Sequence, residues 1–149
     1  MNAFGFHVDP ECLAVFNELK IRRKHRYIVY GLKENTFCVD HIGSREEEDS
    51  DFVKYLNTTE AKYIVTDHDY VITDQYSMQG RPQSKIFFIS WIPTACPVDM
   101  KMAFTASKFD FKNTFSGVVD VDVFSLPEIY SLLGDEESDD SDSDSDSSE

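Results

Sequence analysis

One stretch of the sequence is almost wholly apolar over the length of a strand, and it limits the folds that are open to the chain. This stretch is Lys85–Ile92 (KIFFISWI), which is rich in aromatic and β-branched residues. A strand in which apolar and polar residues do not alternate is covered on both faces, as in a sheet between two layers of helices. The run is much shorter than the roughly 20 apolar residues of a membrane-spanning helix. It therefore predicts the central strand of a layered domain.

The same composition signals predict four other strands. Arg26–Lys33 and Thr36–Ile42 are expected to form a hairpin, because the Glu-Asn pair between them suits a tight turn. A long strand and a short strand are expected over residues 62–73 and 120–124. Residues 75–84 contain a glycine and a proline, which favour a turn region before the central strand.

Two long helices carry clear end signals. Asp9 and Pro10 suit the start of a helix whose apolar residues keep helical spacing to about Ile21. Pro97 begins a second helix, which runs to about Phe115 and is stopped by a glycine. Shorter helices are expected over residues 51–56 and 127–133. This order of elements favours an α/β fold, with a central mixed sheet of about five strands sandwiched between α-helices.

The second long helix carries two stripes of different character. Helical residues advance by about 100° each, so four large apolar side chains fall within about 60° and predict a buried face: Met100, Phe104, Phe111 and Phe115. A second stripe of similar width holds Lys101, Thr105, Lys108 and Lys112. Lysines on a helix usually form a solvated face, but Met102 and Phe109 lie beside this one. Exposed apolar residues rimmed by charge favour a contact surface.

The last fifteen residues, Asp135–Glu149, consist of nine acids and six serines. This composition predicts a disordered acidic tail that follows a single folded domain over residues 1–134. The formal net charge of the chain is −14, and it falls to −5 when the tail is left out. Broad nucleic-acid binding is not expected, because phosphates are repelled by an acidic surface.

Motifs for catalysis or metal binding are missing from the sequence. It has no phosphate-binding glycine loop, no GxSxG and no HExxH. The three cysteines lack ligand spacing, so neither a zinc site nor a disulfide framework is predicted, and a reduced compartment fits best. Asp67 and His68 point to opposite faces of an expected strand with a solvated polar side, so a hydrolase that uses them is a weak alternative. No catalytic residue, metal or cofactor is predicted.

Residues 84–108 (SKIFFISWIPTACPVDMKMAFTASK) closely resemble the signature of the actin-depolymerising factor/cofilin family. In that family an aromatic-rich strand ends in Trp-x-Pro, a Thr-Ala-x-Pro-Val segment follows, and a long helix begins near Lys-Met and carries Ala-Ser-Lys. Residues 11–32 resemble the family's first helix and first strand, and residues 4–9 resemble its N-terminal extension. The likeness covers most of residues 4–133, and the fold that it implies is a mixed sheet between helices.

The resemblance implies binding and no chemistry. Proteins of this family bind actin monomers and the sides of filaments, prefer the ADP-bound form, and sever and depolymerise filaments. Carried over by position, the monomer-binding surface, whose lysines face an acidic surface of actin, comprises Gly5, Lys101, Met102, Lys108 and Lys112. The filament-binding loop keeps two basic residues, Arg81 and Lys85.

Two departures from the family pattern affect this expectation. Asp99 stands two positions before Lys101, where the family usually has a basic residue, so attraction is exchanged for repulsion there. The filament-binding loop is poor in basic residues and the last helix, residues 127–133, has none. Filament-side binding is therefore expected to be weaker than monomer binding.

Other interpretations remain open. A close variant resembles the glia maturation factor branch, which acts on branched actin networks, although the Trp-x-Pro segment favours the cofilin branch. The acidic tail alone would suit a histone chaperone or a scaffold.

Actin is the expected partner, and phosphoinositides are a further candidate through basic residues. The protein is expected to be a monomer, with no membrane span, in the cytoplasm on the actin cytoskeleton. The basic run Arg22–Arg26 is interpreted as a solvated helix end, with a nuclear-import signal as the alternative.

Overall fold

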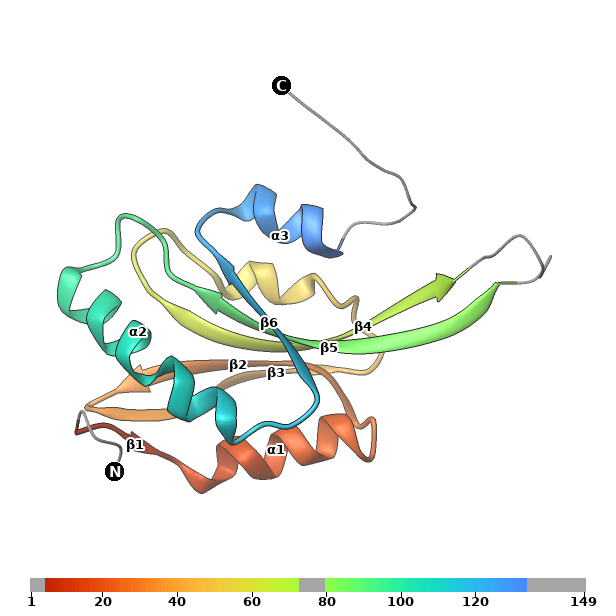
Figure 1. Ribbon diagram of the computed structural model, residues 1–149, viewed down its shortest axis with the longest axis horizontal. Coiled ribbons are helices and arrows are strands. Elements are labelled where there is room, and N and C mark those ends of the chain that lie inside the picture. The colour runs from red at the N-terminus through yellow and green to blue at the C-terminus, as the bar shows by residue number, and fades with distance from the viewer. Residues whose placement is uncertain (1–4, 73–79, 134–149) are drawn as a thin grey trace.

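A curved sheet of six strands forms the middle layer of the protein (Figure 1). The computed structural model describes residues 5–72 and 80–133, without the side chains of Ile72 and Arg81. In sheet order the strands are β1 (His7–Val8), β3 (Thr36–Ser44), β2 (His25–Lys33), β4 (Lys62–Ile72), β5 (Arg81–Trp91) and β6 (Val118–Val123). β1 pairs with β3 and β6 with β5 in parallel, whereas the other neighbours are antiparallel.

Helices cover both faces of this sheet. Two of them, α1 (Pro10–Lys20) and α2 (Val98–Asn113), pack on one face, while the 3-10 helix η1 (Asp51–Tyr55) and α3 (Leu126–Leu133) pack on the other. The predicted α/β class, with a mixed sheet between helices, is confirmed. The sheet has one strand more than predicted, because β1 is only two residues long and leaves no pattern in the sequence.

The larger core lies between the sheet and the helices α1 and α2, and aromatic rings fill it. Phe37, Tyr63 and Phe88 of the sheet meet Phe104 and Phe111 of α2, with neighbouring ring centroids 4.8–6.0 Å apart. Such pairs add roughly 0.5–1.5 kcal/mol each beyond the burial of their area. The hydroxyl of the buried Tyr63 donates to the carbonyl of Phe104. The orientation of α2 on the sheet is therefore fixed by packing and by a hydrogen bond.

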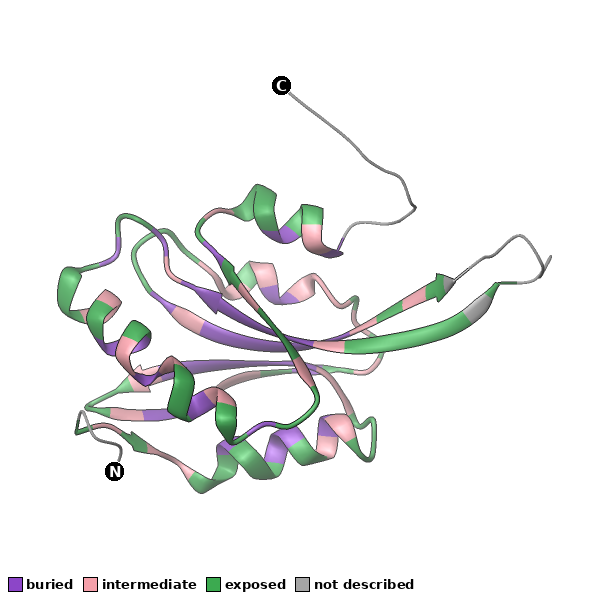
Figure 2. Cartoon of the chain, in the orientation of Figure 1, coloured by how far each residue is buried: buried purple, intermediate pink, exposed green. Residues whose placement is uncertain are grey.

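The predicted buried stripe of α2 is confirmed. Phe104, Phe111 and Phe115 are buried, and Met100 packs against the same core. Figure 2 shows that buried residues gather along the middle of the sheet and on the inner sides of the helices. Only one side of α2 is needed for packing on the sheet, so its outward side is available for contact with a partner.

Two local predictions, the start of the first helix and the tight turn of the hairpin, are confirmed. The carboxylate of Asp9 accepts a hydrogen bond from the backbone N–H of Glu11 (2.9 Å), so it caps α1. Glu34 and Asn35 both have positive φ values, 50° and 67°, as a tight turn between right-twisted strands requires.

The expected turn over residues 75–84 is wrong in its second half. β5 begins at Arg81, and Pro82 pairs with Val71 inside the strand. Proline is tolerated there because β6 pairs with β5 only from Ile86 onward, so no described strand flanks that side of β5 at Pro82. Residues 73–79 and the acidic tail, Asp135–Glu149, lie outside the described residues.

The outer halves of β4 and β5 extend beyond the rest of the sheet (Figure 1). β2 pairs with β4 only over Tyr63–Thr66, and β6 pairs with β5 only from Ile86. Residues 67–72 and 81–85 therefore form a two-stranded ribbon, which we call the β4–β5 ribbon. An isolated two-stranded ribbon is marginally stable in water, so this one needs support from elsewhere in the protein.

Within the described ranges, none of the helices combines the length and the apolar character that a membrane crossing requires.

A close approach between strands generates a prediction for Gly43. A Cβ atom added there would lie 2.2 Å from a ring carbon of the buried Tyr27. Gly43→Ala should therefore lower the free energy of unfolding by about 2 kcal/mol, as overpacking of a core does. Gly31→Ala is the control, because its added Cβ would meet only the ends of two side chains, at 3.1 Å for Lys62 and 3.4 Å for Asp40, and no atom closer than 3 Å. Urea denaturation of both variants checks this, and equal losses of stability would contradict it.

Candidate functional site

The outward side of α2 presents two large apolar side chains. Met102 and Phe109 are 65% and 68% exposed, as the sequence predicted. Methionine and aromatic side chains are enriched where protein interfaces bury most area, and the flexible thioether of methionine adapts to an irregular partner. We call this surface the α2 face and define it by Lys101, Met102, Lys108, Phe109 and Lys112. It is a candidate contact surface, and the roles of its residues stay predictions.

Two lysines of the α2 face are paired with acids of β6. The Nζ atom of Lys108 lies 2.7 Å from Oδ1 of Asp122 and 3.3 Å from Oδ1 of Asp120. The Nζ atom of Lys112 lies 3.6 Å from Oδ2 of Asp120. Partial burial lowers the pKa of Lys108, but the hydrogen bond to Asp122 and the charges of both acids outweigh it, so the pKa stands above its usual value. Two of the three lysine charges of the stripe are therefore compensated by nearby carboxylates.

Lys101 differs from these two lysines. Its ammonium donates to the backbone carbonyl of Thr94 (2.6 Å), and within the described ranges no carboxylate lies within ion-pair distance of it. The nearby Asp99 is exposed and accepts from the backbone N–H of Met100 (3.0 Å) at the start of α2. Lys101 thus presents a charge that no described acid neutralises.

A second exposed apolar group lies where β6 passes into α3. Phe124, Leu126 and Tyr130 form it, and we call it the α3 corner. The backbone N–H of Ile92 donates to the carbonyl of Val123 (3.2 Å), so this corner lies beside the segment that leads to α2. Sequence reasoning missed these three residues, although α3 (LPEIYSLL) has more apolar residues than one buried face requires.

Gly5 lies on the same side of the sheet as α2. The ring of its neighbour Phe6 contacts Phe37 (5.9 Å between centroids), and Phe37 contacts Phe104 of α2 (5.3 Å). Gly5 itself has φ +89°, a conformation that favours glycine, and a Cβ added there would meet nothing within 4 Å. The five predicted monomer-site residues are thus on α2 or on its side of the sheet.

A cluster of charged residues supports the β4–β5 ribbon at its base. Arg23 and Arg45 place guanidinium nitrogens 3.2 and 2.9 Å from Oδ2 of Asp67. Arg23 and Arg26 reach the carboxylate of Asp69 at 3.3 and 2.9 Å. We call these five residues the arginine cluster. Partial burial raises the pKa of Asp69. The hydrogen bond from Arg26 and the charges of all three arginines lower this pKa by more, so it lies below the usual range.

At this cluster one expectation from the sequence is wrong and another is incomplete. The polar side of β4 was expected to be solvated, yet the side chain of Asp67 is only 3% exposed and is held by arginines. The interpretation of Arg22–Arg26 as a solvated helix end holds for residues 22–24, which are exposed, but Arg23 and Arg26 also bind acids of β4. Arg23 adopts this position with φ +53°, which is uncommon for a residue other than glycine. Both differences arise because the partners are distant in sequence, as Arg23 and Asp69 are, 46 residues apart.

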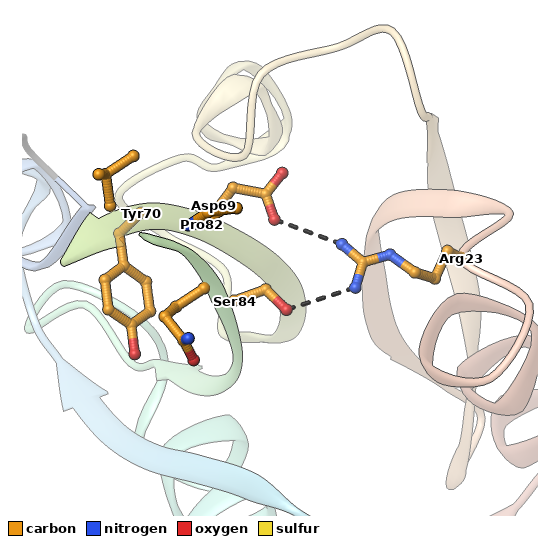
Figure 3. A pocket seen from close by; sticks show the side chains of 7 residues that line it. Arg23, Asp69, Tyr70, Pro82 and Ser84 are labelled. Carbon is orange, nitrogen blue, oxygen red and sulfur yellow. Dashed lines mark hydrogen bonds and ion pairs between the residues drawn. The ribbon is translucent and has the colours of Figure 1, made fainter. Parts of the chain in front are cut away.

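A groove of about 580 Å³ opens beside this cluster (Figure 3). Its lining comprises Arg23, Asp69, Tyr70, Val71, Pro82, Gln83 and Ser84. The figure shows Arg23 reaching across to Asp69 and Ser84, so the guanidinium holds the ribbon toward the end of α1. Lys85, one of the two predicted filament-site residues, lies with its Nζ atom 4.9 Å from the ring centre of Tyr70. The side chain of Arg81, the other, lies outside the described residues.

The described residues offer little for chemistry. His68 and Asp67 point to opposite faces of β4, and His68 is bound to Asp49, so the two do not form a catalytic pair. Among the described residues, no group of three or more His, Cys, Asp or Glu side chains is arranged to hold a metal. The three cysteines are free, and burial raises the pKa of Cys12 to about 12, so this thiol is protonated at neutral pH.

Comparisons with known proteins agree on one family. The family model described as "Cofilin/tropomyosin-type actin-binding protein" matches residues 5–129. Actin-depolymerizing factor 12 of Arabidopsis thaliana is 36% identical over 116 residues, which cover 78% of this chain and 81% of the relative. Actin-depolymerizing factor of Lilium longiflorum is 38% identical over 116 residues, covering 76% and 80%.

Solved structures share the fold. Actin depolymerization factor 2 of Plasmodium berghei superposes with a TM-score of 0.73 at 24% identity, over 87% of this chain and 96% of that one. Streptomyces griseoflavus cofilin superposes with a TM-score of 0.72 at 23% identity, over 84% and 92%.

The arginine cluster generates a prediction about stability. Asp67→Asn should lower the free energy of unfolding by about 3 kcal/mol, because it removes a buried carboxylate that binds two guanidinium groups, those of Arg23 and Arg45. Asp69→Asn is the matched control, since this acid binds the same arginines but is half exposed, and its loss should cost less than about 1 kcal/mol. Urea denaturation at neutral pH measures both. Losses of equal size would mean that burial does not decide the contribution of these acids.

Proposed function

Because the chain belongs to the cofilin/tropomyosin-type family of actin-binding proteins, we propose that it binds actin monomers and promotes the disassembly and turnover of actin filaments. Relatives that are named actin-depolymerizing factors, matched over about four fifths of their own length, support this function. The observation that carries the proposal is the α2 face, where Met102 and Phe109 remain exposed inside the matched region. Two large apolar side chains that stay exposed in the part of the chain that the structure describes suit a protein partner.

The proposed monomer surface combines the α2 face with Gly5 and the α3 corner. Met102 and Phe109 provide apolar anchors, and Lys101 adds a charge at the start of the helix. Lys108 and Lys112 lie in the same surface, where their aliphatic stems add contact area. Preference for ADP-actin belongs to this proposal through the resemblance to the family.

The proposed filament surface is the β4–β5 ribbon with Arg81 and Lys85. The three arginines at the base of the ribbon are paired with Asp67 and Asp69. Lys85 is therefore one of the few positive charges of the ribbon that can attract an acidic partner. We therefore propose that filament-side binding is weaker than monomer binding.

The names of the relatives favour the actin-depolymerising branch over a glia-maturation-factor-like regulator of branched networks. One observation supports the alternative of a histone chaperone or scaffold, namely the acidic composition of residues 135–149. Binding to purified core histones, with none to actin, would favour that function.

Other finer proposals concern ligands and location. The proposed function implies a location in the cytoplasm, on the actin cytoskeleton. It also implies a protein that binds actin without catalysing a reaction, and we propose that it does so as a monomer. Nuclear entry through Arg22–Arg26 is less favoured, because Arg23 and Arg26 are held by Asp67 and Asp69. Phosphoinositides remain candidates through Lys101 and Lys85, whose charges no described acid pairs with.

Titration of labelled ADP-actin and ATP-actin monomers tests the function and the surface together. Met102→Ala should weaken binding by about 1–3 kcal/mol, because it removes an apolar anchor from the proposed contact. Ile21→Ala is the matched control, since Ile21 is 72% exposed but lies at the end of α1, outside the surface. Absence of binding by the unmodified protein would contradict the function. Equal affinities of the two variants would contradict the surface.

The acidic tail generates a prediction for filaments. Nine carboxylates within fifteen residues repel the acidic surface of actin and compete for Lys85 and Arg81. Truncation after Gly134 should therefore raise co-sedimentation with filaments most at low salt, and the difference should shrink as salt rises above about 0.1 M. Full-length and truncated proteins that co-sediment equally at low salt would exclude an inhibitory role for the tail.

A further inference from the structure

The acids that pair with the α2 lysines come from the edge strand of the sheet. Val121 and Val123 of β6 pack on the core beneath α3, so Asp120 and Asp122, which alternate with them, lie on the opposite side. That side faces α2, and there the two acids meet Lys108 and Lys112. The sequence Val-Val-Asp-Val-Asp-Val thus places both carboxylates inside the proposed monomer surface.

We propose that Asp120 and Asp122 are specificity-determining residues, which withhold the charges of Lys108 and Lys112 from actin and leave the α2 face to bind through apolar contact. The inference rests on the proposed function, because it names what tunes the proposed monomer surface. Its consequence is that association with actin monomers depends only weakly on salt.

The electrostatic argument follows from the arrangement of the four charges. Two ammonium groups and two carboxylates within 2.7–3.6 Å have no net charge, and the field of such a group decays faster with distance than that of a bare ion. Steering of an approaching partner depends on the uncompensated charge of a surface. Lys101 is therefore left as the cation of α2 that can attract an acidic partner.

The arrangement also affects selectivity. Two free lysines beside Met102 and Phe109 would attract acidic surfaces of many kinds, including the chain's own residues 135–149 with their nine acids. Neutralised lysines do not attract them, so shape and apolar fit decide which partner stays bound.

Stopped-flow association with labelled ADP-actin monomers, over a range of salt concentrations, tests the inference. Asp120→Asn together with Asp122→Asn keeps the side-chain shapes and frees both lysines. This variant should associate about three- to tenfold faster at low salt, with a steeper decline as salt rises. Adding Lys108→Gln and Lys112→Gln should abolish the gain.

Glu46→Gln with Glu48→Gln is the matched control, because it changes the net charge equally at exposed acids that precede η1, on the opposite face of the sheet from α2. Its association rate should change by less than about twofold. If the double Asn variant does not fold, Asp122→Asn alone serves, since that side chain is 51% exposed and holds Lys108 at 2.7 Å.

The outcomes separate this inference from the proposed function. Unchanged rates and salt dependence in the Asp variants, with an unmodified protein that binds actin, overturn the inference alone. A gain that persists after both lysines are replaced also overturns it. Failure of every variant and of the unmodified protein to bind actin overturns the proposed function as well.

Discussion

The parallel pairing of β6 with β5 is the constraint on which the surface of this protein depends. Parallel neighbours cannot be joined by a tight turn, so the chain crosses one face of the sheet as α2 before it returns as β6. Phe104 and Phe111 fix the crossing helix on the aromatic core. The outward side of α2 therefore lies beside β6, and the α3 corner follows directly from the end of that strand.

Pairing of opposite charges decides what each surface offers a partner. Three arginines are taken up by Asp67 and Asp69 at the base of the β4–β5 ribbon, and two lysines by Asp120 and Asp122 beside α2. The first group of pairs holds a two-stranded ribbon beside which none of the described strands continues. The second removes most of the positive charge from a face whose large apolar side chains remain exposed. We consequently expect apolar contacts to make the main contribution to binding on the α2 face.

Sequence reasoning succeeded where the pattern is local. The apolar run Lys85–Ile92 predicted the buried part of β5, and the stripe on α2 predicted which side packs and which side is exposed. It failed where a residue's environment is set by a distant strand. Nothing near Asp67 in sequence indicates that Arg23 and Arg45 bury it, and nothing near Lys108 reveals the acids of β6. The alternation in β6 does carry a signal, since it places Asp120 and Asp122 together on one side of the strand, opposite Val121 and Val123.

The central claim is that an actin monomer contacts α2 and the α3 corner. Hydrogen–deuterium exchange of the protein, alone and in complex with ADP-actin, tests this most directly. The account predicts slower exchange in peptides that cover Val98–Asn113 and residues 118–130 in the complex, and unchanged exchange around η1 (Asp51–Tyr55) on the opposite face. Protection around η1 without protection of α2 would contradict the account.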